Sequence, residues 1–400
     1  MDILTAAEHA LLAAGGAVVR LGDSAQLTGS DRSRVVRCSV LDGPCGLPAS
    51  VIVKQTRTID HQTDSANPDH SGFGPAWRFH NELAALQFLG KVAEDAGLAP
   101  RLLAADQHAG VLVLEDLGAA RGLDHLLLGA DAAAAERALL AFATALGTLH
   151  AHTHGKQEVY ARFRTRLGAD PAFFSTVAED VFPPERVAAE FHAAVDAAGI
   201  TPVPGVDADL AAVVAFWSAP GPFLAYTHSD PCPDNCLLVD TTLCLIDWEF
   251  GGFRHALVDG ISARMAFPTC WCANRLPEAV LQRMEHVYRT ALATGCPEAG
   301  DDTLFQRAVV EACAYTTIGM LHWAMPGILD ADSAWGLATF RQRLLLRLDG
   351  TARAAAEYGH LQALGATCAA LATKLRSAWP AETYPLPIYP AFCPARRSLS

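Results

Sequence analysis

The chain lacks a surplus of positive charge. Its 400 residues include 30 lysines and arginines against 43 aspartates and glutamates, which gives a formal net charge of -13. Nucleic-acid backbones and anionic membrane surfaces attract clustered basic side chains, and the sequence has no such cluster. We therefore expect neither a nucleic acid nor a membrane as a partner.

Long apolar runs are missing too. The longest uncharged stretch, 210–226, is interrupted by Pro220, Gly221 and Pro222, and no basic segment precedes an apolar one at the N-terminus. A membrane-spanning helix needs about 20 predominantly apolar residues, and a secretory signal has a basic n-region. We expect no targeting or transmembrane segment and a cytoplasmic location.

The 11 cysteines form no disulfide pattern. They are odd in number and scattered along a long chain, whereas disulfide frameworks belong mostly to short secreted domains. Cys232 and Cys236 stand near His228, and Cys270 and Cys272 come later, but these spacings match no common zinc pattern. We predict reduced thiols that pack as small buried hydrophobic side chains.

Enough apolar material is present for two hydrophobic cores. Hydrophobic residues make up 51% of the chain, and 400 residues exceed what one core usually organises. Short β-branched runs at 35–41 and 50–54 predict a small antiparallel sheet, and helical periodicity dominates from Asp131, an expected N-cap. We predict an α+β fold with a β-rich N-terminal lobe, 1–116, and a larger, mainly helical C-terminal lobe, 117–400.

One β segment, at 223–260, interrupts the helical lobe and carries most of the chemistry. Apolar runs at 236–239 and 243–246 predict a β-hairpin with a three-residue loop. This pairing puts Asn235 opposite Asp247 just beyond the paired ends, with Cα atoms about 4.5–5.5 Å apart. An amide oxygen and a carboxylate so placed suit Mg²⁺, which completes its shell with water and phosphate oxygens.

Asp230 lies in the same loop as Asn235. A carboxylate there can accept the proton of an attacking hydroxyl, or orient it, while a metal ion neutralises charge on the phosphates. We expect His228 to brace the loop, because proton transfer by it would duplicate Asp230. Each aspartate or asparagine alone predicts only a turn, but their combined spacing with Asp247 predicts a catalytic loop.

Lysine is scarce, with four residues among the 30 basic ones. Lys54 ends the apolar run at 51–53, where its ammonium can meet the phosphate oxygens of a nucleotide. Apolar residues between 79 and 89 recur at helical spacing, and Gly90 is expected to cap this helix. Glu82, at the margin of the apolar face, can hold Lys54 in place. The alternative is that Lys54 is a surface lysine at a strand end with no role in nucleotide binding.

Two further nucleotide contacts have a weaker signal. The stretch 27–33 precedes a predicted strand, where a phosphate clamp belongs, but it has no G-x-G-x-x-G pattern. Either Ser30 and Ser33 donate hydrogen bonds to phosphates instead, or the stretch is a plain hairpin turn. At the lobe boundary, main-chain groups of Glu115 and Leu117 are expected to meet an adenine edge.

The order of these motifs resembles the aminoglycoside phosphotransferase and choline kinase branch of the protein-kinase-like superfamily. The segments that carry the resemblance are 51–54, Glu82, 113–117, 146–150, 228–235 and 246–249. The two most specific are His-Ser-Asp-Pro-Cys-Pro-Asp-Asn at 228–235 and Ile-Asp-Trp-Glu at 246–249. The resemblance implies a bilobal protein-kinase-like fold that binds ATP.

The resemblance also implies roles for particular residues. It makes Asp230 the catalytic base and Asn235 and Asp247 the Mg²⁺ ligands. Lys54 and Glu82 become the ion pair at the phosphates. One residue has no role without the resemblance: Asp259 matches the structural aspartate that steadies the catalytic loop in these families.

The sequence departs from the family at three loop positions. The usual loop reads His-Gly-Asp-Leu-His-Pro-Gly-Asn, so Ser229, Cys232 and Asp234 are unusual, while the ligand positions remain. The regions 155–218 and beyond 277 carry no assignable motif, and in such folds they build the substrate pocket. The identity of the acceptor is therefore not predicted.

We predict an ATP- and Mg²⁺-dependent small-molecule kinase, which transfers a phosphoryl group to a hydroxyl of an aminoglycoside, amino alcohol, sugar or similar compound. The alternative is a nucleotide-binding pseudokinase without transfer activity. A protein kinase is disfavoured because the Asp-Phe-Gly run and an activation segment are missing. A helical protein that binds no nucleotide would show no thermal shift with Mg·ATP. The sequence does not predict whether ATP or GTP is the preferred nucleotide, nor does it predict the oligomeric state.

Overall fold

The computed structural model describes residues 2–29, 33–56, 74–167, 184–379 and 385–393. Within the described residues the chain forms two compact units. The first unit is built around an antiparallel sheet and the second mainly from helices. The predicted α+β class is therefore confirmed.

The two units do not follow the chain in simple succession. The first contains Met1–Ala120, Lys156–Val181 and Cys244–Gly252, and the second contains the remaining segments. The predicted N-terminal lobe, 1–116, thus lies within the first unit. That unit also takes in two segments from later in the chain.

The centre of the first unit is a five-stranded antiparallel sheet with the strand order β1-β2-β3-β5-β4. Its strands are β1 (Arg20–Gly29), β2 (Ser33–Asp42), β3 (Ser50–Thr56), β4 (Leu102–Asp106) and β5 (Val111–Glu115). Strand β3 is central, and its Lys54 pairs with Val35 of β2 and Leu112 of β5. The strands predicted at 35–41 and 50–54 are confirmed.

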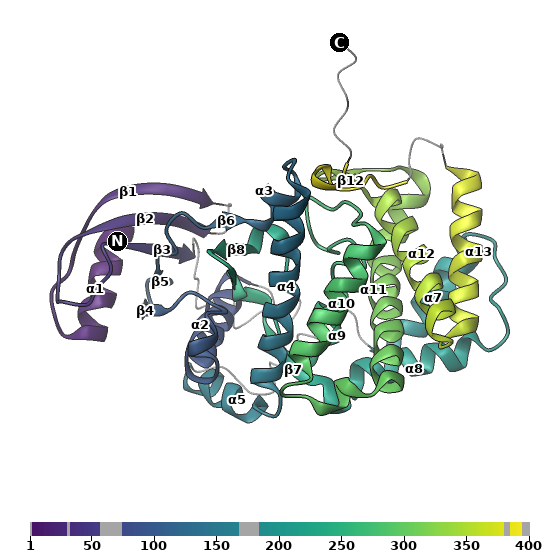
Figure 1. Cartoon of the computed structure of the whole chain (residues 1–400), viewed down its shortest axis with the longest axis horizontal. Coiled ribbons are helices and arrows are strands. Elements are labelled where there is room, and N and C mark those ends of the chain that lie inside the picture. Colours follow the sequence, from purple (N-terminus) through teal and green to yellow (C-terminus); the bar gives the residue numbers. More distant parts are fainter. Residues whose placement is uncertain (1, 30–32, 57–73, 168–183, 380–384, 394–400) are drawn as a thin grey trace, which may run out of the picture. The chain divides into compact units, whose positions relative to one another are not determined.

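Helix α1 (Ile3–Gly15) covers part of this sheet and lies beside β4 (Figure 1). Its Ile3 and Leu11 are buried in one hydrophobic cluster with Val51 and Val53 of β3. The sequence analysis treated this region as β-rich and missed the helix. Its buried face is made largely of alanine, which gives a weak periodic signal.

Helix α2 (Pro75–Val92) carries the predicted apolar face of the first unit, and Phe79 and Leu89 are buried on it. Helix α5 (Gln157–Arg166) packs against it. The predicted cap at Gly90 is wrong. The helix continues through this residue and ends at Val92, because the burial of Leu89 on the helix outweighs the low helix propensity of one glycine.

The second unit is a helical assembly with small β elements. Its helices are α3 (Leu123–Leu127), α4 (Ala132–Thr153), α7 (Val187–Ala197), α8 (Val206–Ser218), α9 (Leu257–Gly260), α10 (Glu278–Leu292), α11 (Asp302–Asp330), α12 (Phe340–Tyr358) and α13 (Gln362–Ala378). Helices α11, α12 and α13 pack in sequence order, and α4 packs against α10 (Figure 1). Asp131 caps α4, as predicted, by accepting a hydrogen bond of 2.9 Å from the Ala134 N–H.

Most of the remaining short strands lie within the predicted β segment, 223–260. Strands β7 (Leu224–Thr227) and β10 (Gly252–His255) form one pair. Strands β6 (Arg121–Gly122), β8 (Cys236–Val239) and β9 (Thr242–Leu245) form a three-stranded sheet. A further pair, β11 (Ala334–Trp335) and β12 (Ala338–Thr339), precedes α12.

Helix α4 is long and apolar enough to cross a membrane, with a mean hydropathy of 1.3 over its most apolar window. Half of that window is buried inside the protein. Leu139, Phe142 and Leu149 are among its fully or almost fully buried side chains. This burial and the contact with α10 are typical of a core helix in a globular unit.

Gly147 allows α4 and α10 to approach closely. A Cβ atom at this position would lie 2.5 Å from the Tyr288 carbonyl oxygen and 2.7 Å from the Ala291 Cβ. Both contacts are shorter than van der Waals separation, and one of them is to backbone. The packing of these two helices therefore depends on the missing side chain.

We predict that Gly147→Ala lowers the free energy of unfolding by about 1–3 kcal/mol, because overpacking forces the helices apart. Gly319→Ala in α11 is the matched control, since a Cβ there meets nothing within 4 Å. That control should gain up to about 1 kcal/mol from helix propensity. Chemical denaturation of both variants measures the difference. Equal effects in the two variants would contradict the packing argument.

Candidate active site

Lys54 lies between two carboxylates of the first unit. Its Nζ atom is 2.7 Å from Glu82 Oε2 on α2 and 2.5 Å from Asp247 Oδ1. The Lys54 side chain is 12% exposed and that of Glu82 is 4% exposed. The structure thus brings together three of the residues that the sequence analysis selected, from three separate parts of the chain.

A third carboxylate joins this group. Carboxylate oxygens of Glu82, Asp247 and Glu249 all lie within 4.8 Å of one another. Arg78 Nη1 lies 2.5 Å from Glu249 Oε1, and Asn81 Nδ2 donates to the main-chain oxygen of Glu249 at 2.9 Å. The sequence analysis missed Arg78 and Asn81, although Arg78, four residues before Glu82, lies on the same side of α2.

The charged groups in this cluster shift one another's pKa. Burial raises the pKa of Glu82 to about 7, against the attraction of Lys54, and burial also raises the pKa of Glu249. Burial alone would lower the pKa of Lys54, but the negative charges of Asp247 and Glu82 outweigh it and raise that pKa. Three carboxylates thus lie around one ammonium and one guanidinium, and a hard cation such as Mg²⁺ bound among them would favour their ionised forms.

The backbone at Asp247 is itself unusual. Its φ of 65° lies in the left-handed region, which aspartate adopts more readily than most residues. Immediately after it, Trp248 is fully buried, and its Nε1 donates to the Leu245 carbonyl at 2.9 Å. The buried indole therefore anchors the segment that presents the Asp247 carboxylate.

In the second unit, the carboxylate of Asp230 is held by its neighbours. Its Oδ1 accepts a hydrogen bond of 2.5 Å from the Thr269 hydroxyl and one of 3.1 Å from the Cys232 thiol. Asn235 Nδ2 donates to the Asp230 carbonyl at 3.1 Å. The amide oxygen of Asn235 makes no hydrogen bond within the described residues, so it stays available as a ligand. The sequence analysis missed Thr269, which is distant in the chain.

A buried aspartate holds the backbone that leads into Asp230. Asp259 is 1% exposed, and its two carboxylate oxygens accept hydrogen bonds from the N–H groups of His228 at 2.6 Å and Ser229 at 3.0 Å. His150 Nε2 lies 3.5 Å from the same carboxylate. The His228 ring accepts a hydrogen bond of 3.3 Å from the Asp230 N–H. These contacts fit the bracing roles expected of His228 and Asp259.

The hairpin after Asn235 differs from the prediction. Strand β8 ends at Val239 and β9 begins at Thr242, so the loop has two residues, not three. Asp240, the first loop residue, has a φ of 53°, as the turns of two-residue hairpins require. The predicted three-residue loop, on which the pairing of Val239 with Leu243 was based, is therefore wrong.

The predicted phosphate clamp is only partly described. Ser33 is the first residue of β2 and pairs with Thr56 of β3. Ser30 lies outside the described residues. The clamp therefore stays a prediction, with one of its two serines placed at the start of a strand.

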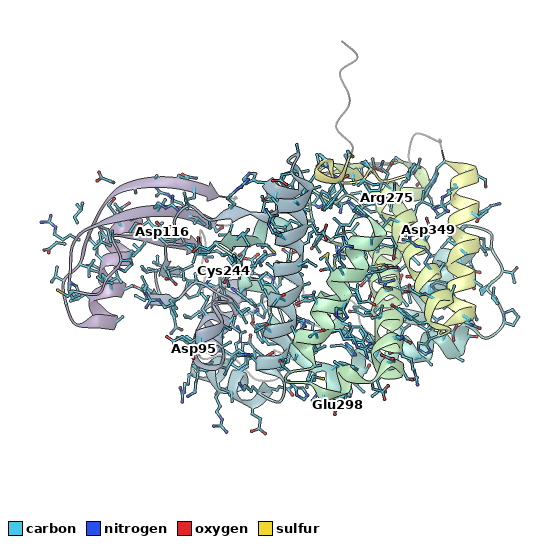
Figure 2. All side chains as sticks on the ribbon, viewed as in Figure 1. Asp95, Asp116, Cys244, Arg275, Glu298 and Asp349 are labelled. Atoms are coloured by element: carbon cyan, nitrogen blue, oxygen red, sulfur yellow. The ribbon has the colours of Figure 1, made fainter. Side chains whose placement is uncertain are left out.

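The predicted adenine-binding segment follows β5. The Glu115 N–H donates to the Arg101 carbonyl at 2.9 Å, whereas the Leu117 N–H has no partner within the described residues. Between them, Asp116, labelled in Figure 2, accepts a hydrogen bond of 2.6 Å from Ser50. Partial burial acts to raise the pKa of Asp116, but hydrogen bonds from Ser50 and Arg37 hold it below its ordinary value. Asp116 thus fixes this segment.

We predict that Asp259→Asn lowers the free energy of unfolding by about 1–3 kcal/mol, because one amide cannot accept both buried N–H hydrogen bonds. Amide hydrogen exchange at His228 and Ser229 should accelerate at the same time. Asp240→Asn, in the exposed β8–β9 turn, is the matched control and should change neither quantity. Unchanged exchange in Asp259→Asn would contradict the bracing role.

A comparison with protein-family models identifies the family of the chain. Residues 29–293, more than half of the chain, match the model of the phosphotransferase enzyme family. This match confirms the resemblance drawn from the motifs and, with the sheet of the first unit and the helices of the second, the bilobal protein-kinase-like fold. Among curated proteins, none matches the chain significantly.

Solved structures give weaker likenesses. A choline/ethanolamine kinase family protein from Mesorhizobium loti is 17% identical, with 86% of this chain and 93% of that chain covered and a TM-score of 0.41. A choline kinase from Cryptosporidium parvum Iowa II is 12% identical, with 89% and 88% covered and a TM-score of 0.44. We base the family assignment on the family model alone.

Proposed function

Because the chain belongs to the phosphotransferase enzyme family, we propose that it is an ATP- and Mg²⁺-dependent kinase that phosphorylates a hydroxyl group of a small molecule. The observation that carries this proposal is the position of Lys54, 2.7 Å from Glu82 and 2.5 Å from Asp247. In kinases a lysine held by a glutamate orients the nucleotide phosphates.

Lys54 binds the phosphate oxygens of ATP in this proposal. Glu82 already restricts its ammonium, so little side-chain freedom is lost when the nucleotide arrives. Asp247 and Asn235 are the proposed Mg²⁺ ligands, since each offers an oxygen atom of the kind that Mg²⁺ prefers. Bound there, Mg²⁺ would neutralise charge that develops on the phosphates during transfer.

Asp230 is the proposed catalytic base. The hydrogen bonds from Thr269 and Cys232 to its Oδ1 fix the position of the carboxylate. It accepts the proton of the substrate hydroxyl as that oxygen forms a bond to the γ-phosphorus. The bond between the γ-phosphorus and its bridging oxygen breaks, and ADP leaves with the electron pair.

The remaining contacts are proposed from chain position. Ser33, with Ser30, donates to the phosphates, and the main-chain groups of Glu115 and Leu117 meet the adenine edge. The acceptor is an aminoglycoside, amino alcohol, sugar or similar alcohol. A cytoplasmic location is proposed because the cysteines are free, as is usual in a reducing compartment.

We predict that Asp230→Asn lowers kcat on the order of 10²–10⁴-fold, because the amide cannot accept the proton. Mg·ATP-dependent ADP release is measured against a panel of aminoglycosides, amino alcohols, sugars and nucleosides. ATP binding, followed by thermal shift, should persist in the variant. Asp240→Asn is the control and should match the unmodified protein. Clear ATP binding with no transfer to any acceptor would favour a pseudokinase.

We predict that Lys54→Met lowers kcat/KM for ATP by about 10²-fold or more, because a preorganised positive charge at the phosphates is lost. Lys91→Met, at the exposed end of α2, is the matched control and should stay within about two-fold. Lys54→Arg keeps the charge and tests for a merely structural effect. Steady-state kinetics with full activity in Lys54→Met would refute the assignment.

A further inference from the structure

Three potential metal ligands meet in the second unit, apart from the oxygen ligands proposed for Mg²⁺. The Sγ atoms of Cys232 and Cys270 and a carboxylate oxygen of Asp234 all lie within 4.8 Å of one another. Cys270 Sγ is 3.8 Å from Asp234 Oδ1 and 3.7 Å from Cys272 Sγ. The sequence spacings gave no zinc pattern because the fold, not the local chain, brings Cys270 to Cys232.

These separations agree with a tetrahedral site. Zinc lies about 2.3 Å from thiolate sulfur and about 2.0–2.2 Å from carboxylate oxygen. Two such sulfurs on one tetrahedron are therefore about 3.8 Å apart, and a sulfur and an oxygen are about 3.5 Å apart. The distances of Cys270 to Asp234 and Cys272 lie within a few tenths of an ångström of these values.

The segment that carries Cys270 is fixed by two buried arginines of α12. Arg343 Nη2 donates to the Cys270 carbonyl at 2.6 Å, and Arg347 Nη2 donates to the Pro268 carbonyl at 2.5 Å. Each arginine side chain is 3% exposed. The position of Cys270 is therefore set by the fold, which lowers the entropic cost of ligand binding.

Arg343 also supplies charge at this place. Its Nε and Nη1 atoms are buried and have no hydrogen-bond partner within the described residues, and the thiols of Cys232 and Cys270 are among its electrostatic neighbours. A buried guanidinium with two unpaired nitrogen atoms is costly unless negative charge lies near it. Two thiolates and one carboxylate around a divalent ion leave one negative charge, which Arg343 balances.

We propose that Cys232, Asp234 and Cys270 form a binding site for a thiophilic divalent cation such as Zn²⁺. Water or Cys272 takes the fourth position. Both thiols lose their protons to solvent when the ion binds, whereas Asp234 binds as a carboxylate and releases no proton. Mg²⁺ does not compete, because it prefers oxygen ligands. The proposal does not rest on the kinase activity, but an ion at this site would take Cys232 away from the hydrogen bond that its thiol donates to Asp230.

The test is a Co²⁺ titration of the full-length, reduced and chelator-treated protein. A tetrahedral thiolate site should give a near-ultraviolet charge-transfer band and visible d–d bands, saturating at one ion per chain and abolished by Zn²⁺. Cys232→Ser and Cys270→Ser should each weaken binding at least about ten-fold, and Asp234→Asn should do so too. Cys236→Ser is the control, because Cys236 is a buried cysteine at the start of β8 that is not among the proposed ligands.

The Co²⁺ titration of the unmodified protein tests the proposal even if a variant fails to fold. Absence of the charge-transfer band at saturating Co²⁺ overturns the proposal. A band that survives in folded Cys232→Ser and Cys270→Ser, as judged by circular dichroism, overturns it as well. So does a band that disappears when the two exposed cysteines, Cys45 and Cys393, are replaced by serine.

Discussion

The first unit depends on an ammonium buried among carboxylates. Lys54, Glu82 and Asp247 come from a central strand, a helix and a segment from far along the chain. The Lys54 and Glu82 side chains are buried, and burying either charge alone would cost free energy. Each is tolerable because the others are present. The contact therefore joins three separate stretches of sequence, and it gathers at the same place carboxylates that can attract a cation.

In the second unit, hydrogen bonds hold an irregular loop in a fixed conformation. Asp230 stands where the backbone follows neither helix nor sheet, and Ser229 before it has a φ of 68°. Such a conformation persists when its N–H groups have fixed acceptors. Buried Asp259 supplies two of them, and the Thr269 hydroxyl fixes the carboxylate itself. The chemistry of the loop is thus set by residues that follow it in the chain.

Strong local signals predicted part of the fold, although helix α1 and the continuation of α2 past Gly90 were missed. Periodicity revealed α2, and the scarcity of lysine drew attention to Lys54. The sequence did not predict that the β8–β9 loop has two residues and not three, because the turn residues are compatible with either length. The contacts of Thr269 and Cys270 were also beyond it, because they arise when a distant segment packs against the loop, and spacing along the chain carries no trace of that packing.

The composition of the first unit has a consequence for how the protein is made. This unit includes Cys244–Gly252, so it lacks one of its own segments until more than half of the chain has left the ribosome. Domains otherwise tend to fold N-terminal first during synthesis. Until residue 247 has been synthesised, Lys54 has Glu82 as a partner but lacks Asp247.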